Sequence, residues 1–220
     1  MRKRSPLSDP EWKTIPWQTI PKTPKDLIVD ILAETPGLVE NLDAFREEND
    51  PDAREILRRE LVEKCWTLES ELSAWRTKLR IQNPAYRLAS PQSTFSMDVL
   101  AAAHIMCIYW VISIVVYGTL HSVIPPSATD CLPRHMDPRL YFRRIAEAVT
   151  LMVHPSSGIY GTQLTTFPTL AVFLYLDAGD RGGEEVREMI FDAYKRSGRH
   201  EIVEKFQASM LRQQRGGWRR

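Results

Sequence analysis

The sequence has few of the residue patterns that indicate a chemical reaction. It contains three cysteines, and no two of them stand at the C-x-x-C spacing of a zinc or redox site. Its five histidines are scattered, with no H-E-x-x-H pair, and G-x-S-x-G, G-x-G-x-x-G and P-loop motifs are missing. The motifs therefore predict no catalytic residue, no cofactor and no metal site.

An excess of charge of one sign is also missing. The chain has 29 basic and 28 acidic residues, for a net charge of +1. No overall field attracts nucleic acid or acidic lipid. Short basic stretches stand at residues 2–4 and 212–220, but no DNA-reading motif accompanies them. An odd number of cysteines and the lack of a secretory signal after residues 1–6 predict a reducing, intracellular location.

Several single features have plain structural interpretations. Residues 158–161 (GIYG) are typical of a turn or helix cap rather than a phosphate cradle. The acidic pairs at 47–48 and 184–185 lie in charged surface segments. Cys107 stands in an apolar run, where a thiol behaves as a small hydrophobe with a raised pKa. We interpret His104, in the same run, as a core or functional-face histidine with a hydrogen-bond partner.

The longest stretch without a charged residue runs from Val99 to Leu120. It is long enough to span a bilayer, or to be the central helix of a helical protein. His104 favours the second interpretation, because ionisable groups at membrane depth are costly. A less apolar stripe at helical spacing favours it too: Ala103, Cys107, Trp110, Ser113, Tyr117 and His121. We expect a buried central helix over about 94–121.

The strongest helical periodicity lies between residues 57 and 79. Apolar residues recur there at steps of three and four: Leu57, Leu61, Cys65, Leu68, Leu72, Trp75 and Leu79. We expect this seam to pack on the rest of the chain. The alternative is a homodimer through the 57–79 helix, since heptad spacing also suits a coiled coil.

The other segments complete an all-α chain, an irregular array of helices. Prolines predict an extended, flexible N-terminal arm over residues 1–22. Thr23 and Pro24 open the helical domain, expected over 23–212, as an N-cap and its following proline. Pro168 is expected to start or kink a helix. Residues 213–220 form a basic tail, expected to be disordered.

The order of segments resembles the C-terminal regulatory region of fungal zinc binuclear cluster transcription factors. The resemblance covers roughly residues 16–212. It is carried by four stretches: a Trp-Pro entry segment (16–45), a charged helix ending in Trp75 (61–75), the Ala-rich apolar helix (95–120), and a helix, Gly turn and Phe-Pro pair that opens another helix (143–176).

This resemblance implies a helical, soluble, nuclear module that acts through partners of the transcription machinery or a small-molecule effector. It also implies control of a metabolic or secondary-metabolite gene cluster. The family's six-cysteine DNA-binding part is not matched by Cys65, Cys107 or Cys131. We therefore expect no sequence-specific DNA binding, no membrane and no catalysis.

Three alternatives to this interpretation stay open. A cytoplasmic location is the alternative to the nucleus. The chain could be a single-span membrane protein anchored by residues 99–120. It could also be a helical biosynthetic enzyme with His104 or Tyr109 in a pocket on the central helix.

Overall fold

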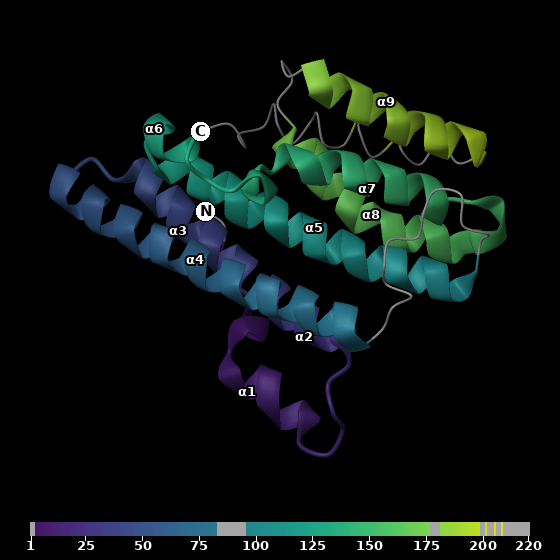
Figure 1. Cartoon of the computed structure of the whole chain (residues 1–220), viewed down its shortest axis with the longest axis horizontal. Helices are drawn as coiled ribbons and strands as arrows, with labels where there is room; N and C mark the ends of the chain where they lie inside the picture. The colour runs from purple at the N-terminus through teal and green to yellow at the C-terminus, as the bar shows by residue number, and fades with distance from the viewer. Residues whose placement is uncertain are drawn as a thin grey trace.

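The computed structural model describes residues 3–82, 96–176 and 181–198, together with Glu201, Lys205 and Ala208. Every regular element in these ranges is helical, so the predicted all-α class is confirmed (Figure 1). The longer helices are α2 (Pro24–Leu32), α3 (Thr35–Glu47), α4 (Pro51–Gln82), α5 (Met97–Val123), α7 (Arg139–Met152), α8 (Gly158–Tyr175) and α9 (Arg181–Arg196). The shorter ones are η1 (Pro6–Ser8), α1 (Pro10–Thr14), η2 (Ile15–Trp17), α6 (Pro126–Thr129), η4 (Arg134–Met136) and η5 (Pro155–Ser157).

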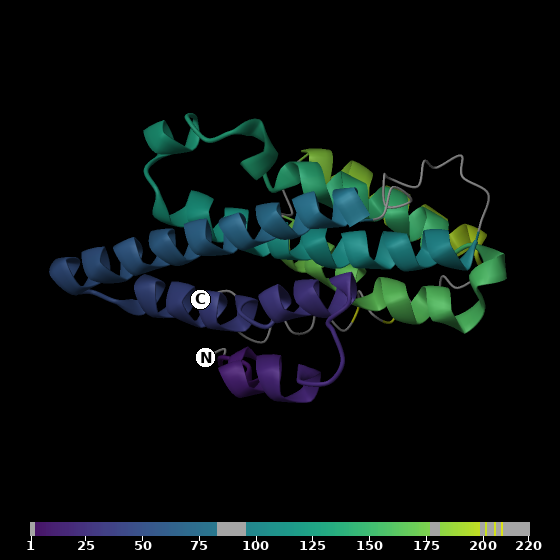
Figure 2. The same cartoon turned by 60° about the horizontal axis from the view of Figure 1, so that its bottom comes forward.

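Helix α5 is the centre of the array, as the apolar run predicted. It packs on α7, α4, α8, α2 and α3. Figures 1 and 2 show α4 with α2 and α3 on one side of it, and α7 and α8 on the other. It is long and apolar enough to cross a membrane, yet 78% of its most apolar window is buried inside the protein. The helix ends at Val123, two residues later than expected, and positions 94–95 lie outside the described residues.

Helix α4 buries its apolar seam within its own chain. Six seam residues are at most 5% exposed, namely Leu61, Cys65, Leu68, Leu72, Trp75 and Leu79. They meet α2, α3 and α5, and Trp75 Nε1 donates a 2.8 Å hydrogen bond to the carbonyl of Pro24. The chain itself thus uses the seam that could have paired with a second copy.

Helix α2 begins where the sequence predicted. Thr23 accepts a hydrogen bond from the Asp26 backbone and the Asp26 carboxylate accepts one from Thr23, which is a capping box. The Thr23 side chain is the main reason why the pKa of Asp26 is lowered. Pro24 occupies the first turn, where no backbone N–H is needed.

The first segment is not the extended arm that its prolines predicted. Residues 6–17 form η1, α1 and η2, and each has a proline at its first turn, where proline is tolerated. Glu34 ties this segment to α4, through Lys13 at 2.5 Å and Lys64 at 2.9 Å. Burial alone would raise the pKa of Glu34, but hydrogen bonds from the two lysines lower it.

Helix α8 corrects the expectation for the Phe167–Pro168 pair. This pair does not open a helix, because α8 begins at Gly158 and Pro168 lies inside it. Gly158 enters the helix at φ 54°, which favours glycine. A Cβ atom at Gly161 would stand 2.0 Å from the Met152 carbonyl oxygen. Because glycine has no side chain, the start of α8 can contact the end of α7.

We expect Gly161→Ala to destabilise the protein by about 1–3 kcal/mol, because the backbone of Met152 must move. Gly118→Ala in α5 is the matched control, since a Cβ there meets nothing within 4 Å and alanine favours a helix. Chemical denaturation followed by circular dichroism measures both. Equal stability of the two variants would contradict the close contact.

Candidate functional site

A polar cluster that is buried at Tyr117 and reaches the surface at His135 joins α4, α5 and η4. Glu69 of α4 lies between Tyr117 of α5, whose hydroxyl donates a hydrogen bond to Glu69 Oε2, and His135 of η4. His135 Nε2 stands 3.3 Å from Glu69 Oε1. The side chain of Glu69 is 15% exposed and Tyr117 is fully buried. A carboxylate at this depth is stable only with such partners.

Two tyrosines, Tyr117 of the cluster and its neighbour Tyr141, are held protonated. Burial raises the pKa of Tyr117 well above its usual value, and the hydrogen bond to Glu69 raises it further. Burial likewise raises the pKa of Tyr141, with a further contribution from Tyr109. Both phenols therefore act as hydrogen-bond donors, and neither becomes a phenolate base near neutral pH.

The same cluster fixes the connection between α5 and α7, residues 124–138. Tyr141 donates a 2.5 Å hydrogen bond to the carbonyl of His135, and His121 Nε2 lies 3.1 Å from the carbonyl of Met136. Met136 is 1% exposed, so it fills a space in the core beneath the connection. Polar contacts and one buried side chain thus hold this proline-rich segment on the helices.

Aromatic rings extend the cluster along α5. Trp75 stacks on Tyr109 at 5.7 Å between ring centroids, and Tyr141 meets Tyr109 at 6.2 Å and Tyr117 at 5.7 Å. The guanidinium of Arg76 lies 5.6 Å from the centroid of the Tyr109 ring. Edge and stacked arrangements at these distances are favourable, so the rings add rigidity beyond simple burial.

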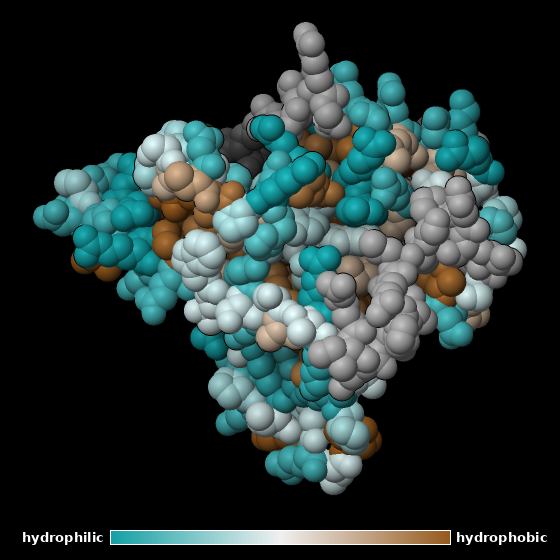
Figure 3. Space-filling model, viewed as in Figure 1, coloured by the Kyte–Doolittle hydropathy of each residue, from teal (hydrophilic) through white to brown (hydrophobic). Residues whose placement is uncertain are grey.

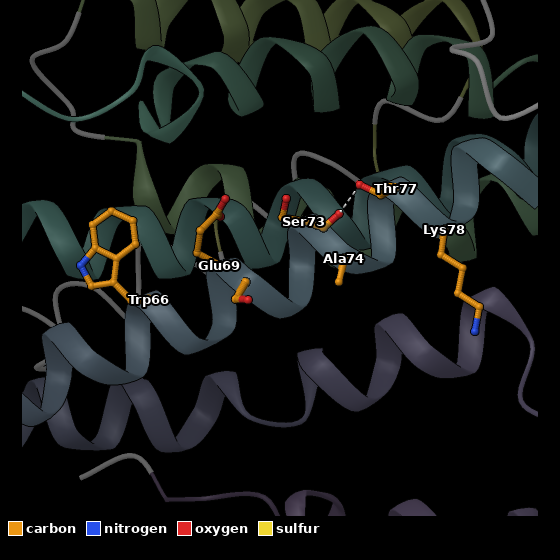
Figure 4. A pocket seen from close by; sticks show the side chains of 7 residues that line it. Trp66, Glu69, Ser73, Ala74, Thr77 and Lys78 are labelled. Atoms are coloured by element: carbon orange, nitrogen blue, oxygen red, sulfur yellow. Dashed lines mark hydrogen bonds between the residues drawn. The ribbon is translucent and has the colours of Figure 1, made fainter.

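A shallow groove runs along the exposed side of α4, next to this cluster. Its described lining residues belong to one helix: Trp66, Glu69, Ser70, Ser73, Ala74, Thr77 and Lys78. Figure 4 shows Trp66, Glu69, Ser73 and Thr77 pointing to one side of α4, and Ala74 and Lys78 to the other. The middle of α4 is pale in Figure 3, in contrast with the hydrophilic surface at its N-terminal end. The groove therefore has an aromatic end, a cationic end and small hydroxyl side chains between them.

His104, singled out from the sequence, lies away from this groove. Burial and the charge of Lys25 lower its pKa, and a hydrogen bond to the backbone of Leu164 acts in the opposite direction. Leu164 is four residues before Pro168, so its carbonyl is the one that loses a helical N–H partner. His104 Nδ1 is buried without a hydrogen-bond partner among the described residues.

The other candidates lie apart from one another. Tyr109 is buried in the aromatic row rather than in a pocket. Burial raises the pKa of Cys65 to about 12 and that of Cys107 further, so neither thiol is a ready nucleophile. Cys131 is exposed. Within the described ranges no group of three His, Cys, Asp or Glu side chains could hold a metal ion.

Comparison with known proteins adds no relative. No family model, curated protein sequence or solved structure matches the chain. The function must therefore be argued from the arrangement of its own side chains.

Sequence reasoning missed Glu69 and the groove. Glu69 follows the seam residue Leu68 and reads as one more charge on an amphipathic helix. Its partners Tyr117 and His135 stand 48 and 66 residues away. The available signal was Tyr117 in the less apolar stripe of the central helix, because a buried hydroxyl needs a partner.

Tyr117→Phe removes the hydroxyl that Glu69 accepts from. We expect a loss of about 1.5–3 kcal/mol in the free energy of unfolding, the usual value for a bond to a charged group. Tyr160→Phe is the control, because Tyr160 is 62% exposed, and it should stay within about 0.5 kcal/mol of the parent. In a Glu69→Leu background the effect of Tyr117→Phe should shrink. An undiminished loss there would contradict the pairing.

Proposed function

We propose that the chain is a helical regulatory protein of the fungal transcription-factor type, which acts by binding and performs no catalysis. Its partners are proteins of the transcription machinery or a small-molecule effector. It works in the nucleus, without a zinc cluster of its own, in the control of a metabolic or secondary-metabolite gene cluster.

The groove on α4 is the observation that carries this proposal. It exposes Trp66 at 45% at one end and Lys78 at the other, on a rigid helix whose opposite seam is fully packed. Trp is among the side chains enriched at the energetic centres of binding surfaces. Glu69, the carboxylate of the groove, already accepts hydrogen bonds within the chain. A side chain engaged in this way suits the wall of a binding surface better than the role of a general base.

The burial of α5 favours a regulatory protein over a membrane anchor. A single membrane span presents its apolar side chains to lipid. Here five helices of the same chain cover them. Exposure of this helix to lipid would require α4, α7 and α8 to leave it, which would expose their own apolar faces to water.

A tethering assay tests the proposal. The full chain is fused to an unrelated DNA-binding domain, and transcription from a reporter with that domain's site is measured in a fungal cell. We expect activation or repression relative to the DNA-binding domain alone, and loss of the effect with Trp66→Ala. Glu188→Ala, at an exposed position of α9, is the control and should keep the effect.

Two results would overturn the proposal. One is a reporter unaffected by the fusion in cells where the chain is present and folded. The other is retention of the chain in the membrane fraction after a carbonate wash. A fluorescent fusion excluded from the nucleus would reject the nuclear part of the proposal.

A further inference from the structure

Helix α4 carries a second heptad-spaced face, opposite its buried seam. We call it the outer face of α4: Glu63, Trp66, Ser70, Ser73 and Thr77, all exposed. The steps from Trp66 to Thr77 are four, three and four, the same spacing that brings the seam against the rest of the chain. This face is also the floor of the groove. This spacing places the five side chains on one face of the helix, and Trp66 is the large apolar side chain among them.

The outer face is complementary to itself when two copies run antiparallel. With a two-fold axis at Ser70, Trp66 of one copy lies at the level of Ala74 of the other, because each stands four residues from the axis. Trp66 then points at the hollow beside Ser73 and Thr77, which lie on the same side of α4 as Trp66 in Figure 4. One large side chain per copy thus meets one hollow per copy, as a two-fold interface requires.

The charges at the rim select the same orientation. Glu63 stands seven residues before Ser70 and Lys78 eight residues after it, so in the antiparallel pair each Glu63 lies opposite the other copy's Thr77, one residue from Lys78 and within reach of its long side chain. Among the described residues neither side chain forms an ion pair within its own chain. A parallel pair would place Glu63 against Glu63 and Lys78 against Lys78, which like-charge repulsion disfavours.

We propose that two copies of this chain associate antiparallel through the outer face of α4, centred on Ser70. Trp66 is the anchor of each copy, and two Glu63–Lys78 pairs fix the register. The patch from Trp66 to Lys78 is only about 18 Å long at 1.5 Å per residue. A patch this short buries less area than a stable interface does, so we expect a weak, transient dimer. A second copy on this face covers Trp66, so the dimer competes for the groove with the partner of the proposed function. Sedimentation of the chain alone tests the dimer separately from the reporter assay.

Sedimentation velocity of the full chain over a range of concentrations tests the dimer. We expect a shift from monomer to dimer, weakened about tenfold or more by Ser70→Arg, which places two like charges together on the axis. Ser70→Ala is the matched control and should leave the dimer intact. Circular dichroism checks that each variant keeps its helices, as expected for substitutions at an exposed position.

A charge exchange tests the register. Glu63→Lys and Lys78→Glu should each weaken the dimer, and the two together in one chain should restore it. Recovery is specific to the antiparallel pairing, because a parallel pair would gain nothing from the exchange. A monomer at all concentrations, a dimer indifferent to Ser70→Arg, or a double variant as weak as the singles would each overturn the proposal.

Discussion

The fold depends on the burial of one uncharged helix. From Val99 to Leu120 the chain carries no Asp, Glu, Lys or Arg, so no face of α5 can be left to water at low cost. Most helices of a small protein have one polar side and need one neighbour. An apolar helix needs neighbours all round, and α5 has α2, α3, α4, α7 and α8. Helices such as α7 and α9 can therefore be amphipathic, with an apolar side toward the core and a polar side outward. Helix α8 differs, since it also exposes Ile159, Tyr160 and Phe167.

The burial of α5 also explains why its polar groups are placed as they are. Ser113 bonds to the carbonyl of Tyr109 one turn before it, and Tyr117 reaches Glu69. Ser113 is thus satisfied within α5 and Tyr117 by a neighbouring helix, whereas His104 Nδ1 has no partner among the described residues. The bond from Tyr117 to Glu69 favours one rotation of α5 about its axis, which apolar packing alone would leave less specific.

Local pattern was enough to predict the elements, but not the contacts between them. The seam of α4 and the span of α5 follow from residues a few positions apart, and both were predicted. For Pro168 the local pattern left two outcomes open, the start of a helix or a position inside one, and the structure places it inside α8. The cluster around Glu69 was not predicted, because its partners Tyr117 and His135 lie 48 and 66 residues away in the sequence. Long-range pairs of this kind leave no periodic signal in a single sequence.

The two faces of α4 have different physical roles, and this makes the outer face accessible to experiment. The seam holds residues that are almost fully buried, so any change there alters folding and function together. The outer face holds exposed, mostly small side chains that contribute little to the folded chain. Its substitutions should leave the free energy of unfolding of the monomer nearly unchanged. An effect of Trp66 or Ser70 variants on assembly or activity would therefore report binding at α4, and not a loss of the fold.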